Sequence, residues 1–440
     1  MKYEPLIYAR KFSEKLRCFW DSTSTRPKVL LICCLTILVF FLRRSDQFLD
    51  PQVWVEDGIY YLPSFLEYGF RSLLEPVPPV GGYLTVIPKL ISGISLWLVG
   101  LHYYPIISTV FSTLFSGLVM SLIALSPISL KGRFLLVIFA LFIPTDVECF
   151  VLPSYTFWFA GLALFLLPFW NADDSKSQKI LRTITLWFCG LSSPAIVPVS
   201  TVLLVKALIS KRLFEAFFTL QALLIAGIQI YIYSRNLQSS DQSASLMNLN
   251  KISIDHLDKI ISKLFGYYSF YSFGNDEANL YVGLVMVTII ASAILLIAKK
   301  KKTAFENPLI SLSFLLFLNI GLVAFRVSVS SIHPYLAGPR YFFYPFILLS
   351  WILVQISHQK SNALRIPAII CLALAVLNAL PKFQRHHESL QWNQAVNRLV
   401  QRGEATLPIH FDGVAARKWT VTLRACGDSF CLVRTSVWVP

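Results

Sequence analysis

The sequence predicts an all-α polytopic membrane protein, with roughly 10–12 transmembrane helices and a small extracytoplasmic α/β segment at the C-terminal end. Two observations lead to this fold class. Hydrophobic residues make up 55% of the 440 residues and charged residues only 14%, compared with about 25% in ordinary soluble domains. The apolar residues also gather into repeated runs of helix length. So few charges cannot cover several soluble domains, and so high an apolar fraction excludes a disordered chain.

The net charge of +15 has two interpretations. A basic chain can bind nucleic acid, but no stretch interleaves basic and aromatic residues as a nucleic-acid groove does. In membrane proteins, Lys and Arg gather in the cytoplasmic loops and set the orientation of the spans. We therefore expect membrane lipid, and no nucleic acid, around these basic residues.

The first span is predicted to follow a cytoplasmic segment, residues 1–28, which carries seven Lys or Arg. Val29–Leu42 is a continuous apolar run, and Arg43 and Arg44 come directly after it. A cleaved signal peptide would show small residues after the apolar core, and none follow here. The run is therefore predicted to be an uncleaved span. Arg43 and Arg44 are expected to extend to the lipid headgroups, with binding of a lipid phosphate as the alternative.

The transmembrane domain is predicted to cover residues 29–380, with a first loop at 45–82 that lies outside. Several of its apolar runs are short, and Pro194 and Pro198 interrupt one of them. Such segments are tolerated in a membrane where they line a cavity. The runs after the first are Tyr83–Val99, Tyr104–Leu125, Phe134–Ile143, Tyr155–Phe169, Ile184–Val205, Phe214–Tyr233, Leu280–Ala298, Leu309–Val323, Tyr341–Ile356 and Ile366–Leu380.

Basic clusters orient these spans, because Lys and Arg stay on the cytoplasmic side. The clusters at 176–182, 206–212, 299–302 and 360–365 all fit a cytoplasmic position. Lys131 and Arg133 should also be cytoplasmic by this rule, but two complete spans between Tyr83 and Leu125 would place them outside. The sequence therefore leaves open on which side of the membrane these two residues lie.

The final segment, residues 381–440, is polar and contains no apolar run long enough to span a membrane. Trp419–Leu423 and Cys431–Val439 have the pattern of strands. Counting the spans puts this segment, which we call the tail, outside the cytoplasm, where a disulfide between Cys426 and Cys431 can form. The alternative is a pair of free cysteines in a cytoplasmic tail.

The first loop carries adjacent carboxylates, Glu56 and Asp57, close to several aromatic residues. Adjacent residues on a helix point about 100° apart, so the two cannot both face one substrate. One would act on the substrate while the other forms local hydrogen bonds. Taken alone, the pair is equally well explained as the solvated face of a loop.

The surrounding motifs resemble the bacterial GT-C glycosyltransferases, polytopic enzymes that use polyprenyl-phosphate-linked sugars. The likeness begins with the acidic motif Glu56-Asp57-Gly58 and continues with Gly82-Tyr83 and Pro88-Lys89. Many relatives have Arg where this chain has Lys89. Weaker likenesses lie further along the chain, at Pro144–Glu148, Trp158, Leu191–Pro194, Gly338–Tyr341, Leu407–His410 and Trp419.

This resemblance implies transfer of a hexose or pentose, with inversion, from a polyprenyl-phosphate donor to a glycan or lipid acceptor. The reaction would take place on the extracytoplasmic face of a bacterial cytoplasmic membrane. Asp57 would be the base, with Glu56 as the alternate, and Lys89, Arg326 and Arg340 would meet the donor phosphate.

Several other residues have both a functional and a structural interpretation. Tyr60, Tyr61, Tyr83 and Trp158 would contact sugar or prenyl groups, unless they belong to the aromatic belt at the membrane surface. Lys89 and Arg340 have a structural alternative, a position at the membrane interface. Glu148 is a further substrate-binding candidate, and its structural alternative is a place in a surface loop.

The sequence indicates no specific cofactor, and a divalent cation is the candidate that it leaves open. Asp276 and Glu277 are the candidate metal ligands, because paired carboxylates suit hard cations, but a solvated loop explains them better. The alternative functions are a transporter or flippase of lipid-linked sugars or other solutes, and an oligosaccharide polymerase or ligase. The chain lacks the internal repeats of many transporters, which favours the enzyme.

Overall fold

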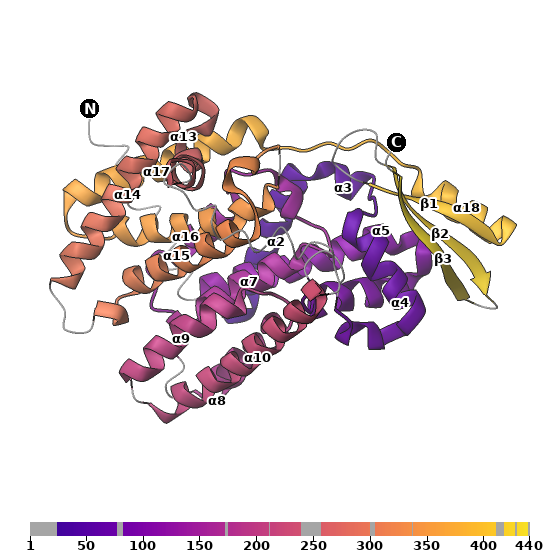
Figure 1. The fold of residues 1–440 in the computed structure, drawn as a ribbon, viewed down its shortest axis with the longest axis horizontal. Coiled ribbons are helices and arrows are strands. Elements are labelled where there is room, and N and C mark those ends of the chain that lie inside the picture. Colours follow the sequence, from indigo (N-terminus) through magenta and orange to yellow (C-terminus); the bar gives the residue numbers. More distant parts are fainter. Residues whose placement is uncertain are drawn as a thin grey trace.

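The computed structural model describes residues 24–76, 82–171, 175–210, 212–238, 257–299, 304–336, 338–410, 418–426 and 429–438. Most of these residues are helical, and a small sheet stands at the C-terminal end of the chain (Figure 1). The segment predicted to be cytoplasmic, 1–28, and the cluster at 299–302 lie largely outside the described residues. A helical membrane protein with a small C-terminal sheet is therefore the fold.

Seven helices in the described part of the chain are long and apolar enough to cross a membrane, and they indicate a polytopic membrane protein. This is fewer than the roughly 10–12 predicted, because several apolar runs form helices too short to span about 30 Å of hydrocarbon. The seven are α2 (Thr25–Arg43), α5 (Val86–Leu125), α10 (Leu213–Gln238), α14 (Asp276–Ala298), α15 (Pro308–Arg326), α16 (Arg340–Ser357) and α17 (Asn362–Ala379).

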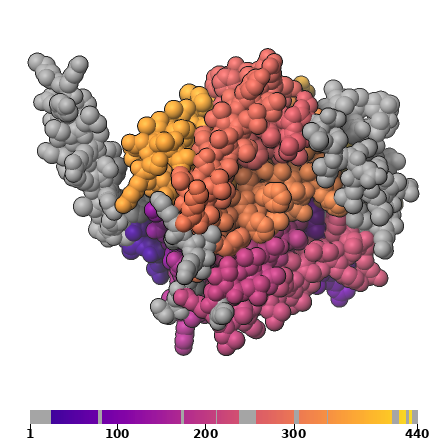
Figure 2. All heavy atoms as spheres, turned by 60° about the vertical axis from the view of Figure 1, so that its left-hand side comes forward, coloured from indigo at the N-terminus to yellow at the C-terminus, as the bar shows by residue number. Residues whose placement is uncertain are grey.

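The shorter helices pack among the long ones. They are α6 (Arg133–Leu141), α7 (Thr156–Leu166), α8 (Lys176–Gly190) and α9 (Ile196–Ser210). The predicted run Ile184–Val205 is divided between α8 and α9. Two groups of helices pack side by side: α8, α9 and α10 form one group, and α15 and α16 form the other (Figure 2). Helix α9 of the first group contacts α15 of the second directly. The central helix is α16, which is buried along nearly its whole length because apolar side chains cover every face.

The basic clusters gather at one end of this bundle. The amide of Lys131 donates to the Gln355 side chain, and the side chain of Lys206 donates to the Pro168 carbonyl. Arg182 forms an ion pair with Glu215. These contacts join residues 126–133, 167–171, 175–182, 206–210, 212–215 and 354–360, which we call the basic end.

The packing of α5 decides at which end of the bundle Lys131 and Arg133 lie, a question that the sequence left open. Its second half runs antiparallel to α2, because Cys33 contacts Ser121 near one end and Gln47 bonds to Thr109 near the other. Residues 121–125 therefore lie beside the start of α2. Lys131 and Arg133 follow directly, so they share an end of the bundle with the start of the first span.

The first half of α5 does not cross the bundle a second time, so the structure does not have the two complete spans between Tyr83 and Leu125 that the sequence left as an open question. Gly100 breaks the helix with φ 64° and ψ −170°, a conformation that favours glycine. Before this break, Lys89 is anchored on the carbonyls of Ser72 and Glu75. Leu96 packs with the tail. Residues 86–99 therefore lie with the first loop, at the end of the bundle opposite the basic end.

The first loop folds into short helical pieces. They are α3 (Ser45–Leu49), the π-helical turn η1 (Asp57–Tyr61), α4 (Leu62–Tyr68) and the 3-10 helix η2 (Gly69–Leu74). Three further pieces, α12 (Leu257–Ile261), η7 (Ser262–Gly266) and α13 (Tyr267–Phe270), precede α14 and pack against it.

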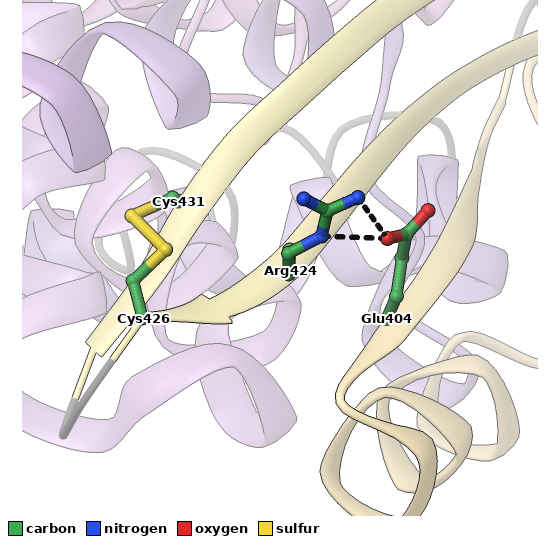
Figure 3. The surroundings of a disulfide bond; sticks show 4 residues. All are labelled: Glu404, Arg424, Cys426 and Cys431. Atoms are coloured by element: carbon green, nitrogen blue, oxygen red, sulfur yellow. Dashed lines mark hydrogen bonds and ion pairs between the residues drawn. A yellow bond between two sulfur atoms is a disulfide. The ribbon is translucent and has the colours of Figure 1, made fainter.

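The tail forms α18 (Trp392–Arg402) and an antiparallel sheet in the order β1-β2-β3, made by Glu404–Ile409, Lys418–Cys426 and Ser429–Trp438. Leu407 and Val421 are buried on the face that packs against the first loop and α5. Cys426 and Cys431 are joined by a disulfide across the β2–β3 hairpin, and the Arg424–Glu404 ion pair lies beside it (Figure 3). The predicted strands and the predicted pairing are present in the structure.

The arrangement of the ends predicts the result of site-directed thiol labelling. Lys131→Cys and Lys360→Cys should react with a membrane-impermeant reagent from one side of the membrane, and Glu388→Cys from the other. The parent protein sets the background from the native cysteines. Reaction of Lys131→Cys and Glu388→Cys from the same side would contradict the packing of α5 against α2.

Candidate active site

A cavity of about 330 Å³ opens at the end of the bundle opposite the basic end. It lies where the first loop meets the ends of the short helices α7 and α9 and of the long helices α10, α15 and α16. Its polar wall contains Glu56 and Arg340. The other lining residues used below are Tyr61, Tyr83, Thr85, Tyr155, Trp158, Val197, Gln229, Ile230, Asn319, Leu322, Phe325 and Arg326.

The site lies within the bundle because some of the helices that end at it are too short to cross a membrane. The helical run from Thr156 to Phe169 is about 20 Å long at 1.5 Å per residue, less than the ~30 Å of a hydrocarbon core. Because Phe169 belongs to the basic end, Tyr155 at the other end of this run lies less than the length of a full span away from the basic end. Residues of both short helices line the cavity, among them Trp158 on α7 and Val197 on α9.

Glu56 and Asp57 point in different directions, as two adjacent residues at the start of a helical turn must. Asp57 is 2% exposed, and its oxygens accept bonds from the backbone N–H and the hydroxyl of Ser154, at 2.7 and 3.2 Å. It does not line the cavity. Glu56 does line it, and its Oε2 atom is buried without a hydrogen-bond partner among the described residues. The geometry therefore turns Glu56, and not Asp57, toward a ligand.

Burial controls the protonation of both carboxyl groups. It raises the pKa of Glu56, an effect that nearby Arg340 opposes and nearby Glu148 reinforces. Burial also raises the pKa of Asp57 well above its usual value, helped by the negative charge of Glu56 and opposed by the bonds from Ser154. Burial therefore favours the protonated form of both carboxyl groups, more strongly in Asp57.

Arg340 connects two carboxylates at the mouth of the cavity. Its Nη1 atom is 3.3 Å from Glu56 and 3.5 Å from Glu148, and it donates to the Tyr155 hydroxyl at 3.2 Å. The Tyr155 hydroxyl in turn donates to Glu148. Glu148 therefore holds Arg340 and Tyr155 in place from outside the cavity lining.

The loop that carries Glu148 and Tyr155 is pinned by backbone contacts to the end of α2. Arg44 donates to the carbonyls of Val147 and Phe150. Val151 then adopts a φ of 62°, a left-handed conformation that is strained for a β-branched residue. Such strain persists only where the surrounding structure fixes the backbone, and it is common beside functional sites.

The far side of the cavity is apolar and opens sideways. Ile230 on α10 and Leu322 and Phe325 on α15 line it, and each is at least 41% exposed. Val197 on α9 forms the floor between these two helices. The cavity therefore joins a charged head region to an apolar groove that faces the surroundings of the bundle.

Trp158 adds a polar group to the head region. Its ring packs against Tyr344, with centroids 4.6 Å apart, and its indole N–H is buried without a partner in the described part of the chain. A buried N–H without a partner costs about 1–3 kcal/mol unless a ligand or water supplies an acceptor. Trp158 and Glu56 thus offer one unused donor and one unused acceptor to whatever occupies the cavity.

Of the other site residues predicted from the sequence, some line the cavity and some do not. Arg326, Tyr61 and Tyr83 line the cavity, and Arg326 interacts with Tyr83 and Tyr341. Lys89 does not line it, because its ammonium group is bound to the carbonyls of Ser72 and Glu75 and so stabilises the first loop. Tyr60 packs toward the tail instead.

The acidic pair at the start of α14 lies away from this cavity. Asp276 accepts a bond from the Tyr267 hydroxyl at 2.6 Å, and Glu277 is exposed. Across the described ranges, no group of three or more His, Cys, Asp or Glu side chains is arranged to hold a metal ion.

Arg43 and Arg44 are not at the lipid headgroups, which corrects the expectation for both. Each is fully buried. Arg43 donates to the carbonyls of Leu141, Ile143, Thr145 and Phe383, and so it uses its N–H groups inside the protein. No sequence pattern distinguished these arginines from interfacial ones, because basic residues after an apolar run are common at membrane surfaces.

Gly58 completes the acidic motif for a steric reason. A Cβ atom there would lie 2.6 Å from side-chain carbons of Ile409 on β1. The glycine therefore lets the tail pack directly on the turn that carries Glu56 and Asp57. Ser154, Thr85, Gln229 and Asn319 complete the site. No sequence motif indicated them, because they are isolated polar residues.

Comparison with protein-family models, with curated proteins and with solved structures found no match.

The contact between Gly58 and Ile409 predicts a coupled effect on stability. Gly58→Ala should destabilise the protein by about 1–3 kcal/mol, because overpacking displaces the tail. In the Gly58→Ala/Ile409→Ala double variant the total loss should be smaller than the sum of the two single losses. Gly227→Ala is the control, since nothing lies within 4 Å of its added Cβ. Additive losses in thermal unfolding would contradict the assigned contact.

Proposed function

We propose that this protein is a GT-C-type glycosyltransferase that moves one sugar from a polyprenyl-phosphate donor to a glycan or lipid acceptor. The basic end is assigned to the cytoplasm by the positive-inside rule, which puts the cavity on the extracytoplasmic side. With the resemblance of the motifs, this implies a bacterial cytoplasmic membrane.

One observation carries the proposal: the cavity joins a carboxylate and two arginines to an apolar groove that is open sideways between α10 and α15. A ligand that fills both regions must have a polar, anionic head and a hydrocarbon tail. A polyprenyl-phosphate sugar has this shape. The unused acceptor on Glu56 and the unused donor on Trp158 suit sugar or acceptor hydroxyl groups.

In the proposed mechanism Glu56 is the general base. It removes the proton of an acceptor hydroxyl while that oxygen attacks the anomeric carbon. The bond from this carbon to the phosphate oxygen breaks, and the lipid phosphate leaves with the electron pair. A single displacement of this kind inverts the anomeric configuration. A positioned base typically contributes about 10²–10⁴-fold to the rate.

The two arginines of the cavity would meet the charge of the leaving phosphate. Arg340 begins α16 and Arg326 ends α15, so both lie at the border between the head region and the apolar groove. Charge-assisted bonds of this kind are stronger than neutral ones and strengthen as charge develops on the leaving oxygen. Glu148 would then act as a positioning residue, because it holds Arg340 beside Glu56.

The proposal is tested by a transfer assay with the purified protein, a panel of polyprenyl-phosphate sugars and candidate acceptors. Parallel reactions with a chelator would show whether a divalent cation is required. Transfer of label to the acceptor is expected. Movement of the donor across vesicle membranes without transfer would support the transporter alternative and contradict the proposal.

Two isosteric variants distinguish the carboxyl groups. Glu56→Gln should lower the transfer rate by about 10²–10⁴-fold, because the base is lost. Asp57→Asn should stay within about tenfold of the parent, because Asp57 does not line the cavity and the amide oxygen can still accept from the Ser154 backbone N–H. Full activity of Glu56→Gln, or loss of activity confined to Asp57→Asn, would contradict the assignment of the base.

The raised pKa of Glu56 predicts the acid side of the pH profile. The carboxylate is the active form, so the transfer rate should fall as the pH drops through the pKa of Glu56. Because burial raises this pKa, the fall should occur above the ~4.3 of an ordinary glutamate. A rate that stays constant down to about pH 4.3 would exclude Glu56 as the base.

The apolar groove predicts an effect that depends on the length of the lipid. Leu322→Trp should raise the KM for a donor with a full-length prenyl chain more than the KM for a short-chain analogue, because the indole fills the groove. Phe317→Trp is the control on the same helix, since Phe317 is 70% exposed and does not line the cavity. Equal changes with both donors would contradict the position of the prenyl chain.

A further inference from the structure

The first half of α5, residues 86–99, has its polar side chains inside and its apolar side chains outside. Lys89, its single charged residue, is 3% exposed, and Ser92 and Ser95 are also buried. A helix that faces water has the opposite arrangement. Every residue of this half-helix that is not buried is apolar, and these residues are Val86, Leu90, Ile94, Trp97, Leu98 and Val99.

The outward residues form one continuous row. Residues at intervals of four lie above one another on one side of a helix, and four of the apolar residues follow this spacing: Val86, Leu90, Ile94 and Leu98. Trp97 widens the row at its end, where Trp97 is 69% and Leu98 is 52% exposed. We call these five residues the outer stripe. A contiguous row of exposed apolar side chains marks an interaction surface.

Contacts on the inner side fix the direction in which the half-helix faces. The ammonium group of Lys89 donates to the Ser72 carbonyl at 2.6 Å. A Cβ atom added to Gly93 would lie 2.6 Å from the Phe65 ring, so α4 packs closely on the same side. The first loop therefore covers the inner side of residues 86–99 and leaves the outer stripe facing away from it.

The second half of α5 indicates what covers the outer stripe. Residues 101–125 are about 37 Å long at 1.5 Å per residue, enough to cross the ~30 Å of a hydrocarbon core without the first half. On this spanning half, Val110, Leu114 and Leu118 are exposed at the same interval of four residues. The outer stripe continues this lipid-facing row on the other side of the break at Gly100. Lipid is therefore the occupant that this continuity selects.

The level of the half-helix is set by its neighbours. Lys89 is bound to the first loop and Leu96 packs with the tail, so residues 86–99 stay at the end of the bundle opposite the basic end. Trp97 and Tyr103 are exposed on either side of the break, as is Tyr68 on α4. Such amphipathic rings are enriched where lipid chains meet headgroups. This part of the protein therefore has the composition of a membrane surface contact.

Helix α18 marks where the surroundings become aqueous. The indole N–H of Trp392 donates to the Leu101 carbonyl at 2.9 Å, so α18 packs beside the break. Apart from Val400, the exposed residues of α18 are all polar: Asn393, Gln394, Asn397, Arg398, Gln401 and Arg402. Two helices in contact thus have outer faces of opposite character. The boundary between lipid and water runs between them.

We propose that residues 86–99 lie at the membrane surface on the side opposite the basic end, with the outer stripe among the upper parts of the lipid chains. The lipid surface is then a partner of the site, because the half-helix follows directly on Gly82, Tyr83 and Thr85, which line the cavity. Lipid contact along the stripe fixes the level of the cavity in the membrane. The benefit for a donor whose phosphate lies at the headgroups rests on the proposed function, whereas the lipid contact itself does not.

The lipid contact is tested by quenching of a fluorescent thiol label on the full-length protein in phosphatidylcholine vesicles. Leu98→Cys places the label on the outer stripe. Val400→Cys is the matched control on α18, since Val400 is 62% exposed, and Leu114→Cys is the control in the spanning half. The parent protein sets the background from the native cysteines.

Two quenchers report on the surroundings of the label. Iodide on both sides of the vesicle membrane should quench Leu98→Cys at least about tenfold less than Val400→Cys, because an anion is excluded from hydrocarbon. Lipids brominated near the headgroup end of the chain should quench Leu98→Cys most strongly. Lipids brominated deep in the chain should instead be the strongest quenchers of Leu114→Cys.

Either of two results would overturn the proposal. Equal quenching of Leu98→Cys and Val400→Cys by iodide would place the outer stripe in water. Strongest quenching of Leu98→Cys by the deep bromines would place the half-helix inside the hydrocarbon and not at the surface.

Transfer gives the second readout. Leu98→Glu should raise the KM for a donor embedded in vesicles by about threefold or more, because a charge disfavours the lipid contact. Val400→Glu should leave this KM unchanged, since Val400 already faces water. An unchanged KM in Leu98→Glu would overturn the link between the stripe and the cavity. If the parent transferred no sugar, the quenching data would still decide the lipid contact, and the proposed function alone would fail.

Discussion

The buried guanidinium groups of Arg43 and Arg44, at the end of the first span, are the interaction on which the site depends. Taking such charges out of water is costly unless the surrounding protein supplies hydrogen bonds. Here backbone carbonyls of residues 141–150 and of Phe383 supply them. One pair of side chains thus fixes α2, the loop that carries Glu148 and Tyr155, and the chain entering the tail.

The rest of the head region follows from this anchor. With the loop at 147–155 held, the Ser154 amide and hydroxyl engage Asp57, and Tyr155 and Glu148 hold Arg340. Asp57 is thereby turned inward, so its neighbour Glu56 faces the cavity. Which of the two carboxyl groups lines the cavity is therefore a consequence of how the loop is anchored.

The site also depends on the tail, the polar segment that follows the membrane domain in the sequence. Ile409 packs on Gly58, and His410 pairs with the backbone next to Glu56. The base proposed for the reaction is therefore held between a segment ordered by α2 and a sheet more than 300 residues further along the chain.

The sequence by itself determined the helical membrane fold, the polar tail with its strands, and the acidic motif, because composition and apolar runs report directly on burial in lipid. The described part of the chain has seven helices long and apolar enough to span, fewer than the roughly 10–12 predicted, and the length of an apolar run does not reveal a break such as that at Gly100. Only the tertiary structure decided that Glu56 rather than Asp57 faces the cavity, that Lys89 supports a loop, and that Arg43 and Arg44 are buried. Each of these depends on which carbonyl or hydroxyl group lies nearby, and those partners come from segments distant in the chain, where no local pattern can indicate them.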